Sequence, residues 1–294
     1  MKRVAIPIVL ATVVAACATP PSPSATVPVQ IRFAAEVNGA PFRCGQSYDN
    51  VGVTRSRITP SDFRLYVSDV ALLTRDGKAV PVALDQDGAW QYRDVALLDF
   101  EDGTGPCSVG TKAIHTAVTG KAPQGDYTGI RFAMAVPFAL NHGDPTVAAS
   151  PLNVTAMFWN WQGGYKFLKF DTGSTGRPAT VSAPDPKGGH SASGFSVHVG
   201  STLCASPGPT QAPSACQNPN RLTVTFDRFD PARQTVVVDI GRVLAGANLD
   251  VNAPNTAPGC MSFLKDPDCP PVMRNLGLPY EGAPAGQQVL FSVR

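Results

Sequence analysis

The stretch that decides the fold is "LNVTAMFWNWQGGYKFLKFD", residues 152 to 171. Its two halves, 152–161 and 165–171, are short and rich in aromatic and β-branched residues, and Gln162-Gly163-Gly164 joins them. Runs of this composition are typical of strands, and glycine adopts the positive φ that a tight hairpin turn requires. The sequence therefore predicts a β-hairpin here.

Side chains alternate between the two faces of a strand. A strand over 152–161 would place Met157, Trp159 and Trp161 on one face, and Phe158 and Asn160 on the other. The hairpin is thus predicted to gather a thioether and two indoles on one surface.

Further runs of the same kind extend this pattern over the chain, at 29–37, 62–73, 127–136, 194–200, 221–229, 234–244 and 288–293. The sequence holds 27 glycines and 28 prolines in 294 residues, so many turns are expected, including a hairpin turn at 229–233 between two strands and a turn near 60–62. We predict an all-β fold, an antiparallel β-sandwich or barrel-like domain with long Pro/Gly-rich loops and disulfides, over 28–294 as one domain. A short helix is expected at 269–277.

The N-terminus has the pattern of an export signal. Lys2 and Arg3 precede an apolar run that ends at Ala16 and is too short to span a bilayer as a helix. The ending Val-Ala-Ala-Cys is similar to a bacterial lipobox, which makes 1–16 a lipoprotein signal peptide and Cys17 the lipidated residue. The alternative is ordinary cleavage nearby. Residues 17–27 would form a Pro/Ser-rich tether, so we expect an exported, periplasmic or outer-membrane-anchored protein that contacts the membrane by its lipid only.

The charge excludes one class of partner. The formal net charge is +2, and both excess basic residues, Lys2 and Arg3, belong to the predicted signal peptide. The mature chain is formally neutral and carries no basic stripe, so nucleic-acid binding is not expected.

Six cysteines follow Cys17, an even number that in an exported chain indicates disulfides. Fifteen pairings are possible for six cysteines, and sequence alone does not choose among them. Proximity favours Cys204–Cys216 and Cys260–Cys269, which leaves Cys44–Cys107.

Two of the four histidines have the better claim to a metal. His142 lies in "LNHGDP", a turn-rich segment after a predicted strand, and His198 stands with Ser196 on the polar face of the strand "GFSVHVG". Together with Met157 they would offer imidazole and thioether ligands, a set that suits Cu(I) better than Mg²⁺ or Ca²⁺. Taken one by one, such histidines are more often structural than ligating.

Sequence motifs for hydrolytic chemistry are missing. The chain has no H-E-x-x-H and no G-x-S-x-G. We therefore expect a binding protein and not an enzyme.

Several segments are similar to one known family, the MbnP-type copper-binding proteins, also described as four-Cys-motif proteins of metallo-mystery pair systems. The resemblance rests on segments spread over most of the chain: "FRCG" (42–45), "DFRLYVSDVAL" (62–72), "LLDFEDGTGPC" (97–107), "GDYTGIRFAMAVPFALNH" (125–142), "PLNVTAMFWNWQGGYKFLKFD" (151–171), "FSVHVGSTLC" (195–204) and "PGCMSFLKDPDCPPVMRNLGL" (258–278). The family name implies four cysteines, whereas this chain has six after Cys17.

The resemblance implies a copper-binding protein whose partner, a di-haem MauG-like peroxidase, oxidises a tryptophan to kynurenine. The tryptophan motif of the family falls on Trp159 and Trp161, and the histidines inside family motifs are His142 and His198. One copper, expected as Cu(I), would be held by histidine and the modified residue, in a protein expected to be monomeric. The alternative is a β-sandwich glycan- or protein-binding module in which the two indoles form an exposed stacking platform.

Overall fold

The computed structural model describes residues 25–175, 194–208 and 211–294. The predicted signal peptide, Cys17 and His190 lie outside these ranges. Within them, no helix is long and apolar enough to cross a bilayer.

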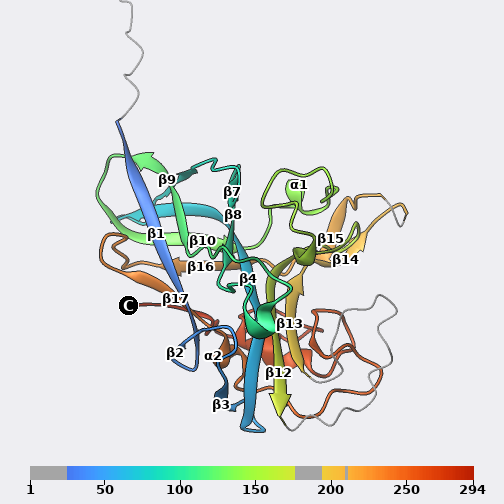
Figure 1. Ribbon diagram of the computed structural model, residues 1–294. Coiled ribbons are helices and arrows are strands. Elements are labelled where there is room, and N and C mark those ends of the chain that lie inside the picture. Colours follow the sequence, from blue (N-terminus) through green and yellow to red (C-terminus); the bar gives the residue numbers. More distant parts are fainter. Residues whose placement is uncertain (1–24, 176–193, 209–210) are drawn as a thin grey trace, which may run out of the picture.

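The residues in these ranges form two main sheets, of which the larger has eleven strands and is built around one long central strand (Figure 1). Its main path runs in the order β16-β10-β4-β12-β13-β18, and the shorter strands pair at its sides. Its members are β3 (Tyr48–Val51), β4 (Ser56–Thr74), β5 (Ala79–Pro81), β7 (Gln91–Tyr92), β8 (Val95–Asp99), β10 (Tyr127–Met134), β11 (Phe158–Asn160), β12 (Gly164–Thr175), β13 (Phe195–Gly200), β16 (Leu222–Phe226) and β18 (Gly259–Cys260).

The second main sheet has six strands and packs against the first. Its order is β19-β17-β1-β9-β6, with β2 paired to β1. Its members are β1 (Thr26–Val37), β2 (Ala40–Pro41), β6 (Ala83–Leu84), β9 (Ala117–Pro123), β17 (Thr235–Asp239) and β19 (Phe291–Val293). Phe132 of the larger sheet contacts Phe33 and Phe291 of the smaller one, with ring centroids 5.7 and 5.2 Å apart, so the apolar core fills the space between the sheets.

The remaining elements are short. A two-stranded ribbon, β14 (Thr202–Ala205) and β15 (Ala215–Asn218), stands apart from both main sheets. The helices are η1 (Gly105–Cys107), α1 (Phe138–Asn141), η2 (Thr155–Met157), α2 (Ile240–Leu244) and α3 (Cys269–Asn275). The predicted all-β class and the helix at 269–277 are confirmed, and neither main sheet closes into a barrel.

Most neighbouring strands are antiparallel, as predicted, but two pairs are parallel, β1 with β17 and β13 with β18. The predicted strand 234–244 is wrong in its second half, because Asp239 accepts a hydrogen bond from the Gly241 amide and begins α2. The predicted hairpin at 229–233 is also wrong. Its two strands belong to different sheets, so the turn is a crossover.

Residues 60–62 form no turn. They lie within β4, where Pro60 coincides with a shift in the register against β12. Proline lacks the amide that a regular ladder needs, and a bulge accommodates it. The structure also contains the two disulfides that proximity favoured, Cys204–Cys216 and Cys260–Cys269, and the remaining pair, Cys44–Cys107.

Candidate metal centre

The hairpin predicted within residues 152–171 exists, but its first strand is much shorter than predicted. β11 pairs antiparallel with β12, and it spans Phe158–Asn160 only. The backbone before it accepts hydrogen bonds from side chains in place of a neighbouring strand. The hydroxyls of Tyr66 and Tyr165 donate to the carbonyls of Pro151 and Leu152. A strand over 152–161 is therefore wrong.

Met157 does not belong to a strand at all. It ends the 3₁₀ turn η2 and is fully buried in the apolar core. Strand alternation consequently gives no reason for Met157 to share a face with Trp159. Its role as a ligand stays a prediction.

Register places charged side chains from three strands on one face of the larger sheet. Lys169 of β12 lies opposite Arg64 of β4 and His198 of β13, and Asp171 lies opposite Asp62 and Ser196. Directly opposite residues point to the same side of a sheet. We call this set the polar ladder: Asp62, Arg64, Lys169, Asp171, Ser196 and His198.

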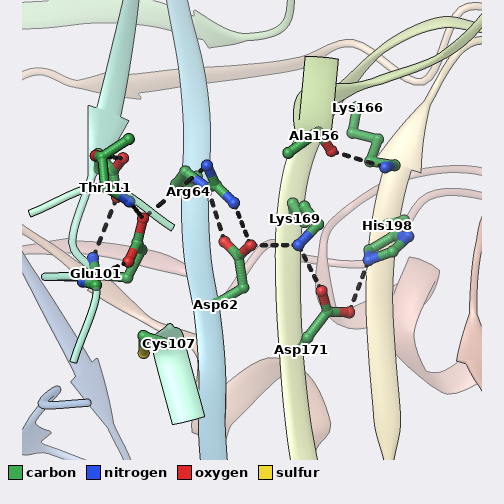
Figure 2. Close-up of polar contacts among 12 residues, drawn as sticks. Asp62, Arg64, Glu101, Cys107, Thr111, Ala156, Lys166, Lys169, Asp171 and His198 are labelled. Atoms are coloured by element: carbon green, nitrogen blue, oxygen red, sulfur yellow. Dashed lines mark hydrogen bonds and ion pairs between the residues drawn. The ribbon is translucent and has the colours of Figure 1, made fainter. Parts of the chain in front are cut away.

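The polar ladder is bonded along its whole length (Figure 2). Arg64 Nε donates to Asp62 at 2.8 Å, and Lys169 Nζ bridges Asp62 and Asp171, at 2.6 Å from the latter. Asp171 also accepts from Ser196 Oγ at 2.6 Å and from His198 Nε2 at 2.8 Å. A continuous network thus joins β4, β12 and β13.

Burial and neighbouring charge set the protonation of the His198 end. Burial lowers the pKa of His198, so its ring is neutral at pH 7, although Asp171 works in the opposite direction. Burial alone would raise the pKa of Asp171, but the hydrogen bond from His198 and the charge of Lys169 hold it well below its usual range. His198 therefore donates from Nε2 and carries its lone pair on Nδ1.

Lys166 belongs to the same face because of a bulge. The register of β12 against β13 shifts between Lys166 and Leu168, which brings Lys166 opposite Gly200 and keeps Lys169 opposite His198. Lys166 Nζ donates to the carbonyl of Ala156 at 2.8 Å, so it holds η2 against the sheet. Burial, with a contribution from the charge of Lys169, lowers the pKa of Lys166 to about 8.

The indole of Trp159 lies over the end of β13. A Cβ atom on Gly200 would be 2.6 Å from Cζ3 of Trp159, so only glycine leaves room for the ring. Gly200 and His198 are two residues apart on β13, so their Cα atoms are about 7 Å apart and their Cα–Cβ directions lie on the same face. Phe263 covers the indole with ring centroids 5.3 Å apart, and the Oγ of the adjacent Ser262 donates to the His198 carbonyl.

His142 is linked to the other tryptophan. It follows α1, is buried, and its Nδ1 lies 3.0 Å from the carbonyl oxygen of Trp161, which can only accept. Its Nε2 lies 3.7 Å from Sγ of Cys216. His142 thus contacts the backbone of Trp161, whereas His198 lies on the strand whose Gly200 meets the ring of Trp159.

His115 has a separate setting. Its ring stacks on Trp90 with centroids 5.2 Å apart, and its Nδ1 contacts the Leu97 carbonyl at 2.6 Å. Among the described residues, two groups bring three potential metal-binding side chains together, and each contains a disulfide: His142 with Cys204–Cys216, and Glu101 with Cys44–Cys107. A disulfide sulfur is not a thiolate, so neither group is a metal site in this state.

A family model described as MbnP matches residues 26–262, which include the polar ladder, both histidines and the tryptophan hairpin. This chain belongs to the MbnP family. The match confirms the resemblance seen in the sequence.

A solved structure, MbnP from Methylosinus trichosporium, is 35% identical to this chain, with a TM-score of 0.73 over 92% of this chain and 98% of that one. No match is found among curated proteins. The MbnP family assignment therefore rests on the family model and on a close structural relative.

Sequence reasoning missed most of the polar ladder and the role of Gly200. A signal for the ladder was present, because Asp62 and Arg64, like Lys169 and Asp171, are charged residues at alternate positions of otherwise apolar strands. The partners themselves are unpredictable from local sequence, since Lys169 and Asp62 are 107 residues apart.

Proposed function

We propose that this MbnP-family protein binds one copper ion in the cell envelope, and that a di-haem MauG-like peroxidase first oxidises one of its tryptophans to kynurenine. The observation that carries the proposal is the position of Trp159. Its indole lies over Gly200, on the face that also bears His198.

The residues fit a soft metal. A histidine that donates one ring N–H to a carboxylate presents the other nitrogen to a metal in a fixed orientation, and Asp171 supports His198 in this way. Ring opening of an indole creates a ketone and an aryl amine, which add donor atoms beside the imidazole. Copper, when bound, would supply a one-electron redox centre, and a set of this kind favours Cu(I).

We assign the modification to Trp159 in preference to Trp161. The ring of Trp159 borders the His198 face, whereas the contact that ties Trp161 to a histidine uses its backbone carbonyl. Met157 stays a predicted additional ligand. The prediction that His142 is another competes with its contact to Cys216 Sγ at 3.7 Å, and loss of copper from the oxidised His142→Ala variant would decide in favour of the copper site.

Peptide mass mapping of residues 151–171 from native cells tests the modification. We expect the exchange of one ring carbon for one oxygen at Trp159. The same change at Trp161 would reject the choice of residue, and two intact indoles in cells that contain the peroxidase would reject kynurenine formation.

Copper titration tests the binding site. In the presence of a competing Cu(I) chelator we expect one equivalent in the wild type and its loss in His198→Ala. His115→Ala, which changes a histidine stacked on Trp90, is the matched control and should keep the copper. Equal binding by both variants would contradict the assignment of His198.

Export, lipid attachment and the monomeric state complete the proposal. Metabolic labelling with palmitate should mark the wild-type protein and not Cys17→Ser, and light scattering should give a monomer mass. The rival function, an indole platform for a glycan or protein, is less favoured because Gly200 and Phe263 cover Trp159.

A further inference from the structure

The ligand atoms of His142, Cys204 and Cys216 lie within 4.8 Å of one another. In the present state the two sulfurs are bonded. We propose that reduction of Cys204–Cys216 by a dithiol creates a second metal site, in which two thiolates and the His142 imidazole bind one thiophilic cation of the Cu(I) and Zn²⁺ class. This inference does not depend on copper binding at His198.

A chain of hydrogen bonds fixes the tautomer that such a site requires. The Tyr165 amide donates to Oδ1 of Asn141 at 2.9 Å, so the amide nitrogen of Asn141 faces Nε2 of His142, 3.1 Å away. Nε2 is therefore an acceptor, and Nδ1 donates to the Trp161 carbonyl. Burial lowers the pKa of His142 and keeps the ring neutral. The lone pair of His142 consequently sits on the nitrogen that faces Cys216.

The spacing already matches that of a coordinated ion. Bonds of about 2.3 Å to sulfur and about 2.05 Å to nitrogen that meet at a tetrahedral angle place the two ligand atoms about 3.6 Å apart. The observed distance from Cys216 Sγ to His142 Nε2 is 3.7 Å. The ion would replace the weak donation from Asn141, and one tetrahedral position would remain for a further ligand.

The ribbon geometry keeps the two sulfurs together after reduction. Cys204 and Cys216 lie directly opposite each other in the antiparallel β14–β15 pair, so both side chains point to the same side. In Figure 1 this ribbon lies beside α1, the helix that precedes His142. The ribbon pairs with neither main sheet, so opening the disulfide leaves their ladders intact.

Of the three disulfides between described residues, Cys204–Cys216 has both cysteines partly exposed. Cys44 is partly exposed but is bonded to the fully buried Cys107, and Cys260 and Cys269 are both fully buried. Attack by an external thiolate requires access to a sulfur atom. A dithiol reductant should therefore reach Cys204–Cys216 first.

The chemistry balances with the dithiol as the only co-reactant. Its two thiols lose two electrons and two protons and form a disulfide, and Cys204 and Cys216 gain them and become thiols. Binding of the cation then releases the two thiol protons to solvent.

Stepwise reduction of the mature chain with dithiothreitol, followed by alkylation and mass mapping, tests the first half of the inference. We expect label on Cys204 and Cys216 at reductant concentrations that leave the other four cysteines bonded. Label on Cys44, Cys107, Cys260 or Cys269 at the same or lower concentrations would overturn it.

Metal titration of the selectively reduced protein tests the second half. Co²⁺ serves as a spectroscopic probe of thiolate ligation, and Cu(I) with a competing chelator gives the stoichiometry. We expect one more equivalent than the oxidised protein binds, with a sulfur-to-cobalt charge-transfer band. His142→Ala should weaken this binding by about tenfold or more, and His115→Ala should match the wild type.

The double variant Cys204→Ser, Cys216→Ser keeps the ribbon polar and removes both thiols. It should fold, as judged by its thermal unfolding, and lack the extra equivalent and the charge-transfer band. Retention of either signal would overturn the inference, and so would loss of copper from oxidised His142→Ala, because His142 would then belong to the first site. Failure of the His198 copper site alone would leave the extra equivalent unchanged, so the two proposals fail separately.

Discussion

Two carboxyl groups on the larger sheet differ in protonation: Asp171, at the His198 end of the polar ladder, is ionised at pH 7, whereas Asp99, beyond the Arg64 end, is about half protonated. At the His198 end, Asp171 receives hydrogen bonds from His198 and Lys169, which hold its pKa well below its usual range against the effect of burial. At the other end, burial raises the pKa of Asp99 to about 7, and the charge of Arg64 offsets only part of this. The difference lies in the partners: His198 and Lys169 contact Asp171 directly, whereas Arg64 bonds to Asp62 and approaches Glu101 at 4.0 Å.

An ionised Asp171 beside a neutral His198 supports the cation site proposed at this end. A carboxylate that keeps its charge beside a neutral imidazole attracts a positive ion and orients the ring. A carboxyl that is half protonated near pH 7 does neither as well.

The largest loss of stability is expected for Asp62→Ala, because Asp62 links Arg64 to Lys169. Arg64 and Lys169 would then be left buried with one partner fewer, and loss of one member of a buried ion pair costs about 3–5 kcal/mol. Chemical denaturation measures the change. Asp49→Ala, which breaks an exposed pair with Arg57, is the matched control and should cost at most about 1 kcal/mol. Equal effects would show that Asp62 has no special role in the network.

A pH-dependent effect is expected for Asp99→Asn. The folded-state pKa of Asp99 is raised from 3.8 to about 7, so the stability gained from its protonated form is complete below about pH 4 and is lost as the pH rises toward 7. Asparagine does not ionise. Relative to the wild type, the free energy of unfolding of the variant should therefore rise by at most about 1.4 kcal/mol per pH unit between pH 4 and 7.

Denaturation of both proteins at several pH values measures that gain. Asp102→Asn, at an exposed neighbouring carboxylate, is the control and should show no such trend in this window. A constant difference between Asp99→Asn and the wild type over pH 4–7 would show that Asp99 is ionised throughout, like Asp171.

A smaller loss of stability is expected for Gly200→Ala, at the His198 end. The added methyl would meet Cζ3 of Trp159 and the Tyr165 carbonyl, each at 2.6 Å, and crowding of this kind costs about 1–3 kcal/mol. Because the indole must move, tryptophan emission and the yield of kynurenine should change as well. Gly173→Ala, in β12, meets its nearest atom at an ordinary 3.8 Å and should leave both unchanged. If Gly200→Ala kept the tryptophan emission and the kynurenine yield of the wild type, the indole of Trp159 would not lie on the face that bears His198.

The sequence predicted well those features that depend on local pattern. Alternation placed Ser196 and His198 on one face, and the structure confirms this because both reach Asp171. The turn around Gly163 and Gly164 was also predicted, since few other residues adopt the φ of +71° found at Gly164.

Features that depend on long-range register were not predicted. Lys166 and Lys169 are three residues apart and reach the same face only because β12 carries a bulge, which no local pattern announced. Met157 was misplaced for a related reason. Two buried tyrosine hydroxyls bind the backbone before it and so compete with the strand that its sequence favours.

The smallest effect is expected for Ser196→Ala, which removes one of the donors to Asp171 at the His198 end. The other donors, Lys169 and His198, remain, so the carboxylate is not left unsatisfied and the cost should be about 1 kcal/mol. Denaturation measures this cost, and Ser61→Ala, on the same sheet but outside the polar ladder, provides the baseline. A loss as large as that of Asp62→Ala would mean that the hydroxyl, and not Lys169, keeps Asp171 charged, and the contrast between the two ends would then need a different cause.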